Sequence, residues 1–156
     1  MIVGSREPLD NTNIRYAVLN KNHFTVIERF GNIQDWNVSQ ITNMNSLFKN
    51  NENFNEDISN WNVSNVTNMQ EMFAHATNFN QPLNNWDVSH VTNMNKMFKS
   101  ALSFDQPLNN WNISNVTNMS HMFDGANNFN QSLNNWNVSN VTNMRNMFHN
   151  ANSIVF

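Results

Sequence analysis

Histidine and carboxylate side chains are the groups in this sequence that could act as metal ligands or as an acid–base pair. Many residue types recur every 25 positions, so functional groups that belong together should align in columns with that step. No two of the five histidines align. His75 aligns with Ser100 and Gly125, His121 with Lys96 and Asn146, and His149 with Asp124 and Lys99. The sequence therefore predicts no metal ion and no cofactor.

The carboxylates give the same result. Asp87 and Asp35 each stand in a column that otherwise holds asparagine, and Glu56 and Asp57 align with glutamine and with proline or serine. The column that begins at Ser39 is uniformly serine, but no histidine or acid recurs beside it. Since no nucleophile–base or acid–base pair repeats, we expect no catalytic residue and no enzyme activity.

The composition excludes further classes of function. The 156 residues carry a net charge of −3, and the lysines and arginines are scattered over several columns, so we expect no nucleic-acid binding. Cysteine is absent, which excludes disulfides and thiolate chemistry. Asparagine, methionine and phenylalanine are over-used, and their AT-rich codons indicate an AT-rich genome.

The N-terminal segment places charged residues where a signal peptide would need an apolar stretch, and no such stretch follows, so membrane insertion is not expected. If Met1 is the natural start, the protein stays inside the cell or is associated with a virion. If the chain is a fragment of a longer protein, the cell surface is the alternative.

Five tandem copies of a 25-residue unit organise the chain. Five identical columns mark them, and they start at Trp36, Thr42, Asn43, Met44 and Phe48 and continue without an insertion. An unbroken register of this kind is typical of a solenoid, in which each unit packs only on its neighbours.

The third unit, residues 79–103, indicates how one copy folds. Trp86 and Val88 alternate with polar residues, which is the period of a strand with one buried face. From Met94 to Ala101 the apolar residues have the i, i+3, i+4, i+7 spacing of a short helix. We therefore predict an α/β solenoid: a leucine-rich-repeat-like, right-handed stack of short parallel strands and short helices.

A different segment precedes the repeats. Residues 1–29 are predicted to form a helical N-terminal cap, with one helix over 13–19 and a second short helix or strand over 25–30. Residues 30–156 are predicted to form the single solenoid of five repeats. Asp10, Asn11 and Thr12 supply N-cap side chains for the first helix.

The phrase FNQPLNNWDVSHVTNMNKMF resembles the BspA-type leucine-rich-repeat surface proteins, once described as a mycoplasma domain of unknown function. The resemblance covers residue 30 to the end, through the motif W-[ND]-[VI]-S-x-[VI]-T-N-M-x-x-[ML]-F. It implies a bacterial, protist or viral protein that interacts with a host and has no catalytic residues. Such surface proteins usually carry a leader, which this chain lacks, and this favours an intracellular or virion-associated product.

Two features of the repeat suggest binding. The predicted strands point a ladder of amides and one carboxylate outward on the concave face, comprising Asn60, Asn62, Asn85, Asp87, Asn110, Asn112, Asn135 and Asn137. The ladder either solvates an exposed sheet or hydrogen-bonds an extended peptide or glycan. On the helix side, pairs such as Gln70–Glu71 and Asn95–Lys96 differ between copies, so a partner there would be recognised residue by residue.

The tryptophan column has two interpretations. Exposed indoles would stack on sugar rings, whereas indoles that share the parity of Val88 would form a ladder in the core. We favour the core. The function predicted from these features is a non-enzymatic protein-binding scaffold, with a glycan-binding or adhesive surface module as the alternative. No cap follows the fifth repeat, so the sequence also predicts a weak homo-oligomer through the C-terminal end.

Overall fold

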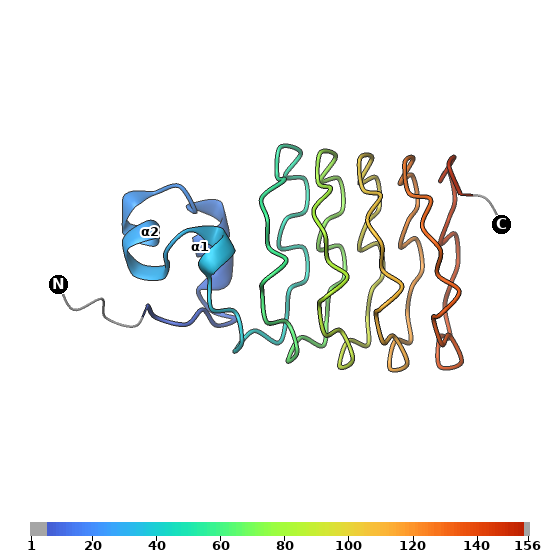
Figure 1. Cartoon of the computed structure of the whole chain (residues 1–156), viewed down its shortest axis with the longest axis horizontal. Coiled ribbons are helices and arrows are strands. Elements are labelled where there is room, and N and C mark those ends of the chain that lie inside the picture. The colour runs from blue at the N-terminus through green and yellow to red at the C-terminus, as the bar shows by residue number, and fades with distance from the viewer. Residues whose placement is uncertain (1–5, 155–156) are drawn as a thin grey trace.

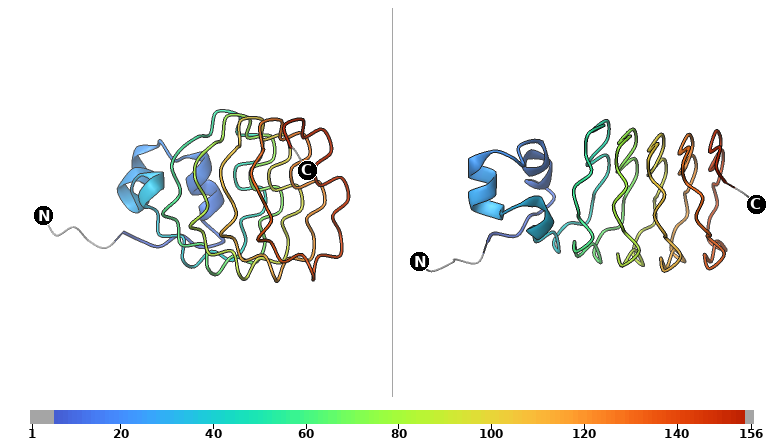
Figure 2. Two further views of the ribbon diagram at one scale, coloured as in Figure 1. Left: turned by 45° about the vertical axis from the view of Figure 1, so that its right-hand side comes forward. Right: turned by 45° about the horizontal axis from the view of Figure 1, so that its top comes forward.

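The computed structural model describes residues 6–154, which form a small helical cap followed by five stacked coils (Figures 1 and 2). The cap contains α1 (Ile14–Leu19) and α2 (Phe24–Phe30), and a single 3-10 turn, η1 (Ile33–Asp35), leads into the coils. Coils 1 to 5 begin at Trp36, Trp61, Trp86, Trp111 and Trp136. The two helices lie within one residue of the segments that the sequence predicted.

The predicted α/β solenoid of parallel strands and short helices is wrong. Beyond η1 no helix and no strand occurs in the described part of the chain, and successive coils share only isolated parallel bridges between residues of the Asn43 column. Trp86 and Val88 are buried around the exposed Asp87, as the alternation predicted, but this segment is a pair of turns. With neither regular element present, the structure does not support a leucine-rich repeat.

Tight turns replace the predicted helix from Met94 to Ala101. A helix would bond each amide to the carbonyl four residues earlier. Instead the amides of Met94, Lys96, Phe98 and Ser100 donate to carbonyls of the next coil, at 2.8–2.9 Å. Between them, the amides of Met97 and Lys99 donate to the carbonyls three residues earlier in the same coil, at 3.2 and 3.1 Å. The hydrogen-bonding groups of the backbone are therefore paired alternately with the neighbouring coil and with residues of the same coil.

The turns require left-handed backbone at two residues of each coil, four positions apart. Lys96 and Ser100 have φ of 56° and 54°, and the corresponding residues of the other coils have φ between 55° and 72°. Only Gly125 in these positions avoids the steric cost that a Cβ brings there. With this geometry two side chains point inward and the next two outward, so Met94, Met97, Phe98 and Ala101 are all fully buried.

A second set of hydrogen bonds points from each coil back to the preceding coil. The amide and hydroxyl of Thr92 both donate to the carbonyl of Thr67, at 2.9 and 3.3 Å, and the threonines of coils 2, 4 and 5 repeat the amide bond. Asparagine and aspartate side chains accept the amides two residues on, as Asn93 does from Asn95 at 3.0 Å. These local bonds explain why asparagine is so frequent in the repeat.

Aromatic columns fill the interior of the stack. The phenylalanines of the Phe48 column stack at 5.5–5.7 Å between ring centroids, and those of the first four coils each pack on a ring of the Phe54 column within the coil. The tryptophans lie beside them with exposed fractions of 3–9%. Each indole donates its N–H to a backbone carbonyl, at 2.8–3.1 Å. The prediction that the tryptophans belong to the core is confirmed.

The cap covers much of the first coil. Leu9, Ile14 and Val18 are buried against it, and Arg15 donates to the carbonyl of Asn45 at 2.7 Å. The predicted N-cap role is wrong, because the N-cap residue of α1 is Asn13 and no side chain caps the helix. Asp10 accepts the amides of Thr12 and Asn13 just before α1, at 2.8 and 3.1 Å, but Asn11 bonds to coil 1.

The fifth coil has no neighbour on its outer side among residues 6–154. Val138 and Met144 are 41% and 47% exposed, whereas their equivalents in the first four coils are buried. The amides of Met144 and Asn146 find no acceptor in the described residues, although their equivalents all donate to the following coil. Self-association through this end therefore stays a prediction.

Replacing Trp86 by alanine should cost about 3–5 kcal/mol of unfolding free energy, the range for emptying a buried aromatic site. Trp136 packs on coils from one side only, so Trp136→Ala is the matched control and should cost less. Urea unfolding followed by circular dichroism measures both. Equal losses, or wild-type emission that acrylamide quenches as easily as free indole, would contradict the stacked core.

Gly125→Val should destabilise the protein by about 1–3 kcal/mol, because a branched side chain would have to adopt φ of +72° with its Cβ 3.2 Å from the Ser100 hydroxyl. The control is Ser100→Gly, which removes a Cβ from the same column and should leave the stability unchanged or slightly raised. Thermal melts of both variants measure the effect. A neutral Gly125→Val would show that the left-handed backbone is not required there.

Candidate interaction surface

Four neighbouring columns in the segment of left-handed turns are among the most variable between copies. We call these columns the variable strip; they begin at Asn45, Ser46, Lys49 and Asn50 and repeat every 25 residues. The column of Ser46 holds five different residues in five coils, and the other three hold four kinds each. The inward positions between them are nearly constant. The strip therefore presents different side chains in each coil on the same backbone geometry.

Charge is also segregated onto the strip. From residue 36 to the end, every lysine and arginine lies in it, namely Lys49, Lys96, Lys99 and Arg145. Only two carboxylates accompany them, Glu71 and Asp124. The other five carboxylates of the coils lie in other columns, and these columns hold no lysine or arginine. One side of the repeat is thus basic on a protein of net charge −3.

In the first half of the strip, Glu71 binds lysines from the two neighbouring coils. Its two carboxylate oxygens face Lys49 and Lys96, which come from the coils on either side. The Glu71 side chain is 13% exposed, against 38% for each lysine. The hydrogen bond from Lys49 lowers the pKa of Glu71, and burial opposes it. These residues, with Ala74, His75 and Lys99, line a hollow of about 140 Å³.

Asp124 organises the second half. One oxygen lies 3.1 Å from Lys99 Nζ and 3.0 Å from His121 Nδ1, and the other lies 3.0 Å from His149 Nδ1. Burial would raise the pKa of Asp124, but the hydrogen bonds from His149, His121 and Lys99 outweigh it and hold the pKa below its ordinary value of 3.8. An ionised carboxylate only accepts, so both imidazoles donate through Nδ1 and keep Nε2 for other contacts.

Column alignment placed His149, Asp124 and Lys99 in one column, but the search for repeated histidines and repeated acids did not recognise this mixed column as a cluster. His121 meets Asp124 across a turn of three residues, whereas His149 meets it from the next coil. The signal that could have found it was the shared column of Lys99, Asp124 and His149. Over residues 6–154 no group of three or more histidine, aspartate or glutamate side chains is arranged to hold a metal ion.

The eight residues predicted as a binding ladder are all exposed, but they do not form the ladder of a concave sheet. Asn62, Asp87, Asn112 and Asn137 each accept the amide two residues on at 3.0–3.2 Å, which fixes a turn. Hydrogen bonds from Ser89 lower the pKa of Asp87 accordingly. Asn60, Asn85, Asn110 and Asn135 lie at the preceding turn. The structure therefore gives half of them a local role, and binding by any of the eight stays a prediction.

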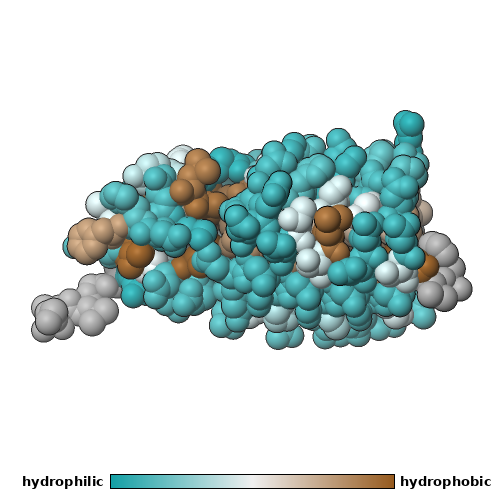
Figure 3. Space-filling model, turned by 90° about the horizontal axis from the view of Figure 1, so that it is seen from above, coloured by the Kyte–Doolittle hydropathy of each residue, from teal (hydrophilic) through white to brown (hydrophobic). Residues whose placement is uncertain are grey.

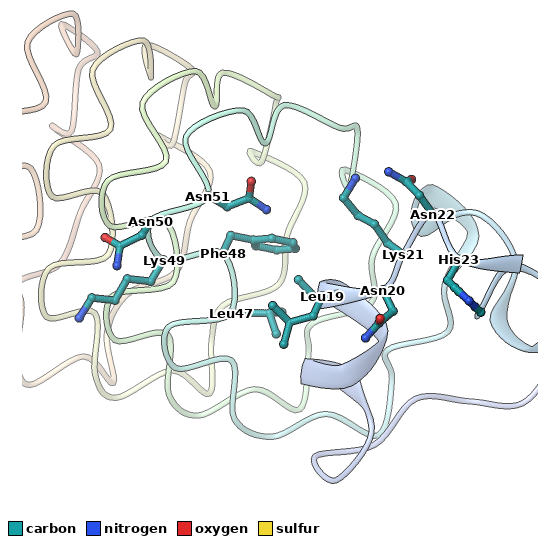
Figure 4. A pocket seen from close by; sticks show the side chains of 11 residues that line it. Leu19, Asn20, Lys21, Asn22, His23, Leu47, Phe48, Lys49, Asn50 and Asn51 are labelled. Carbon is teal, nitrogen blue, oxygen red and sulfur yellow. The ribbon is translucent and has the colours of Figure 1, made fainter. Parts of the chain in front are cut away.

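A groove of about 640 Å³ separates the cap from coil 1. Leu19 enters it from the end of α1, and Leu47 and Phe48 line it from the coil (Figure 4). Leu19 is 84% exposed, and Tyr16, Phe24 and Ile27 add further apolar surface on the cap. Seen from above, hydrophobic groups gather over this N-terminal part, whereas the surface over the coils is mostly hydrophilic (Figure 3).

A family model described as a mycoplasma protein of unknown function, DUF285, matches residues 18–126 and again 86–155. The chain belongs to this family. The two matches overlap because the 25-residue period allows more than one register. Membership supports the resemblance to BspA-like repeat proteins at that coarse level, without the leucine-rich-repeat features. No match was found among the curated proteins or the solved structures.

One observation bears on membranes. Neither helix in the described part of this DUF285 protein is long and apolar enough to span a bilayer.

Asp124→Asn should lower the unfolding free energy at neutral pH by about 1–3 kcal/mol, because it weakens three charge-assisted contacts to a buried group. A carboxyl with a depressed pKa stabilises the fold above its unfolded pKa, and this contribution disappears as the pH falls through the folded pKa. The difference in unfolding free energy between the two proteins should therefore shrink as the pH falls below 3.8, the ordinary pKa of this carboxyl. Urea unfolding at about pH 7 and about pH 2 measures the difference.

Asp87→Asn is the matched control for that experiment. Asparagine makes the same turn contact in the other copies, so this change should alter stability by less than about 0.5 kcal/mol. A neutral Asp124→Asn at pH 7, or a deficit that persists at pH 2, would contradict the role assigned to the Asp124 carboxylate.

Proposed function

We propose that this protein is a non-enzymatic scaffold that binds a partner protein through the variable strip. The observation that carries the proposal is the contrast between constant and variable positions: the columns that build the core hardly change, whereas each column of the strip holds four or five kinds of residue. A surface needed only for solubility could keep the same polar residues in each copy, as the Thr42 and Asn43 columns do.

The strip also has the rigidity that a binding surface requires. Its backbone is fixed by four hydrogen bonds at each junction between coils, all 2.7–3.0 Å long. Partner residues would therefore meet side chains at set spacings, with little ordering of the backbone on binding. A rigid surface of adjustable side chains is what repeat scaffolds offer to protein partners.

The glycan-binding alternative has less support. Sugar binding by ring stacking needs aromatic faces at the surface, whereas the five indoles are interior and their N–H groups are already bonded to backbone carbonyls. The exposed aromatic rings Tyr16 and Phe24 belong to the cap and do not recur along the coils. We therefore retain the protein-binding proposal alone.

The test is affinity capture from lysate of the source cell, comparing the wild type with two variants. The strip variant carries His75→Asn, Lys96→Asn and His121→Asn, because asparagine already occupies both columns and tolerates left-handed backbone. The control variant carries Asn85→Ser and Asn110→Ser in the predicted amide ladder. Circular dichroism must show that both variants keep the wild-type fold.

We expect a protein that the wild type and the ladder variant capture and that the strip variant loses by about tenfold or more. If the ladder variant loses capture and the strip variant keeps it, the binding site is the amide ladder and not the strip. The absence of any protein that distinguishes the variants would overturn the proposal.

A further inference from the structure

We infer that the segment bound by the variable strip is acidic, a stretch of a partner protein rich in aspartate and glutamate. This inference rests on the proposed function and adds the chemistry of the partner. Its first support is the formal charge of the strip, where four cationic side chains face two carboxylates and leave +2 with the histidines neutral. The remainder of residues 36–156 carries five carboxylates and no lysine or arginine.

The second support is the orientation of the charged groups. The carboxylates of Glu71 and Asp124 are 13% and 10% exposed and are fully engaged by cations of the strip. Lys49, Lys96 and Lys99 are 31–38% exposed, and His149 is 57% exposed. The carboxylates thus lie beneath the surface and hold the cations above them. A partner would meet mainly N–H donors, whose natural acceptors are carboxylates.

The third support is continuity along the stack. Glu71 joins coils 1, 2 and 3, and Asp124 joins coils 3, 4 and 5, so the cations form a line and not separate points. Arg145 extends the line onto coil 5, where no carboxylate contact to it occurs among residues 6–154. A segment lying along the stack would therefore find lysine or arginine in coils 1, 3 and 5, with His75 and His121 in the strip of the coils between them.

A nucleic acid fits this surface less well than an acidic protein segment. Nucleic-acid binding needs enough lysine and arginine to neutralise several phosphates, and binding domains are usually basic as a whole. Here the strip has four such residues, three of them already within reach of a carboxylate, and the protein is acidic overall. Electrostatic complementarity with spaced carboxylates suits a mixed strip better than a continuous phosphate backbone does.

The experiment measures binding of a fluorescent glutamate-rich peptide to the full chain by anisotropy, at low and at high salt. A peptide with glutamine in place of glutamate and a single-stranded oligonucleotide are the comparison probes. The test variant is Lys96→Asn with Arg145→Asn, since asparagine already occupies both columns. It removes two charges and leaves Lys49 on Glu71 and Lys99 on Asp124, so neither buried carboxylate loses its last cation.

The matched control is Arg6→Gln with Arg29→Gln, which removes two charges from the cap. Both arginines are about half exposed, in pairs with Asp35 and Glu7. We expect the glutamate peptide to bind the wild type, to weaken at high salt, and to lose about fivefold in affinity on the strip variant. The control variant should bind as the wild type does, and the glutamine peptide should not bind.

Three results would overturn the inference: no binding of the glutamate peptide, equal weakening in both variants, or tighter binding of the oligonucleotide. The scaffold proposal fails separately. If lysate capture still depends on the strip but the captured protein contacts it through a segment that is not acidic, the scaffold stands and the acidic partner does not. If no capture depends on the strip, the scaffold proposal itself falls.

Discussion

Backbone hydrogen bonding between coils is the constraint on which the rest of this structure depends. A 25-residue coil without strands or helices leaves most of its amides and carbonyls to find partners elsewhere, and unpaired buried groups would be costly. The chain meets this need with amides at alternate residues that donate to the following coil, as Phe98 does to Met122 at 2.9 Å. That spacing requires tight turns, and the turns require left-handed residues. The inward and outward positions of the side chains follow from it.

The arrangement explains why the same columns serve both stability and recognition. Left-handed turns send pairs of side chains alternately into the core and out to solvent, so the constant Met97 and Phe98 lie next to the variable Lys96 and Lys99. The inner pair is held by packing on both sides and tolerates little change. The outer pair is held mainly through its backbone, so its side chains can differ between coils, although single contacts such as those of Asp124 still add to stability.

The sequence predicted burial far better than it predicted backbone structure. Met94, Met97, Phe98 and Ala101 are buried as their spacing indicated, but over eight residues a period of 3.6 cannot be told from the period of 4 that the turns impose. The left-handed positions were hidden because Lys96 and Glu71 seldom adopt them. Their one visible signal was the column that holds Asn50, Gly125 and Asn150. The cluster around Asp124 was missed because Lys99, Asp124 and His149 share a column but not a residue type, and because His121 reaches Asp124 from another column across a turn.

The 25-residue step of nearly every contact between coils has a consequence for how such a chain can change length. Deleting a single residue between Trp86 and Thr92 in coil 3 would shift every later column against the earlier ones, and would break the Thr67–Thr92 bond and the Phe73–Phe98 stack together. Deleting one whole unit would restore each contact with an equivalent residue from the next copy. Tolerated insertions and deletions are therefore expected in whole units, as unequal recombination between repeated gene segments would produce. Each such event would add or remove one set of recognition residues and leave the others in place.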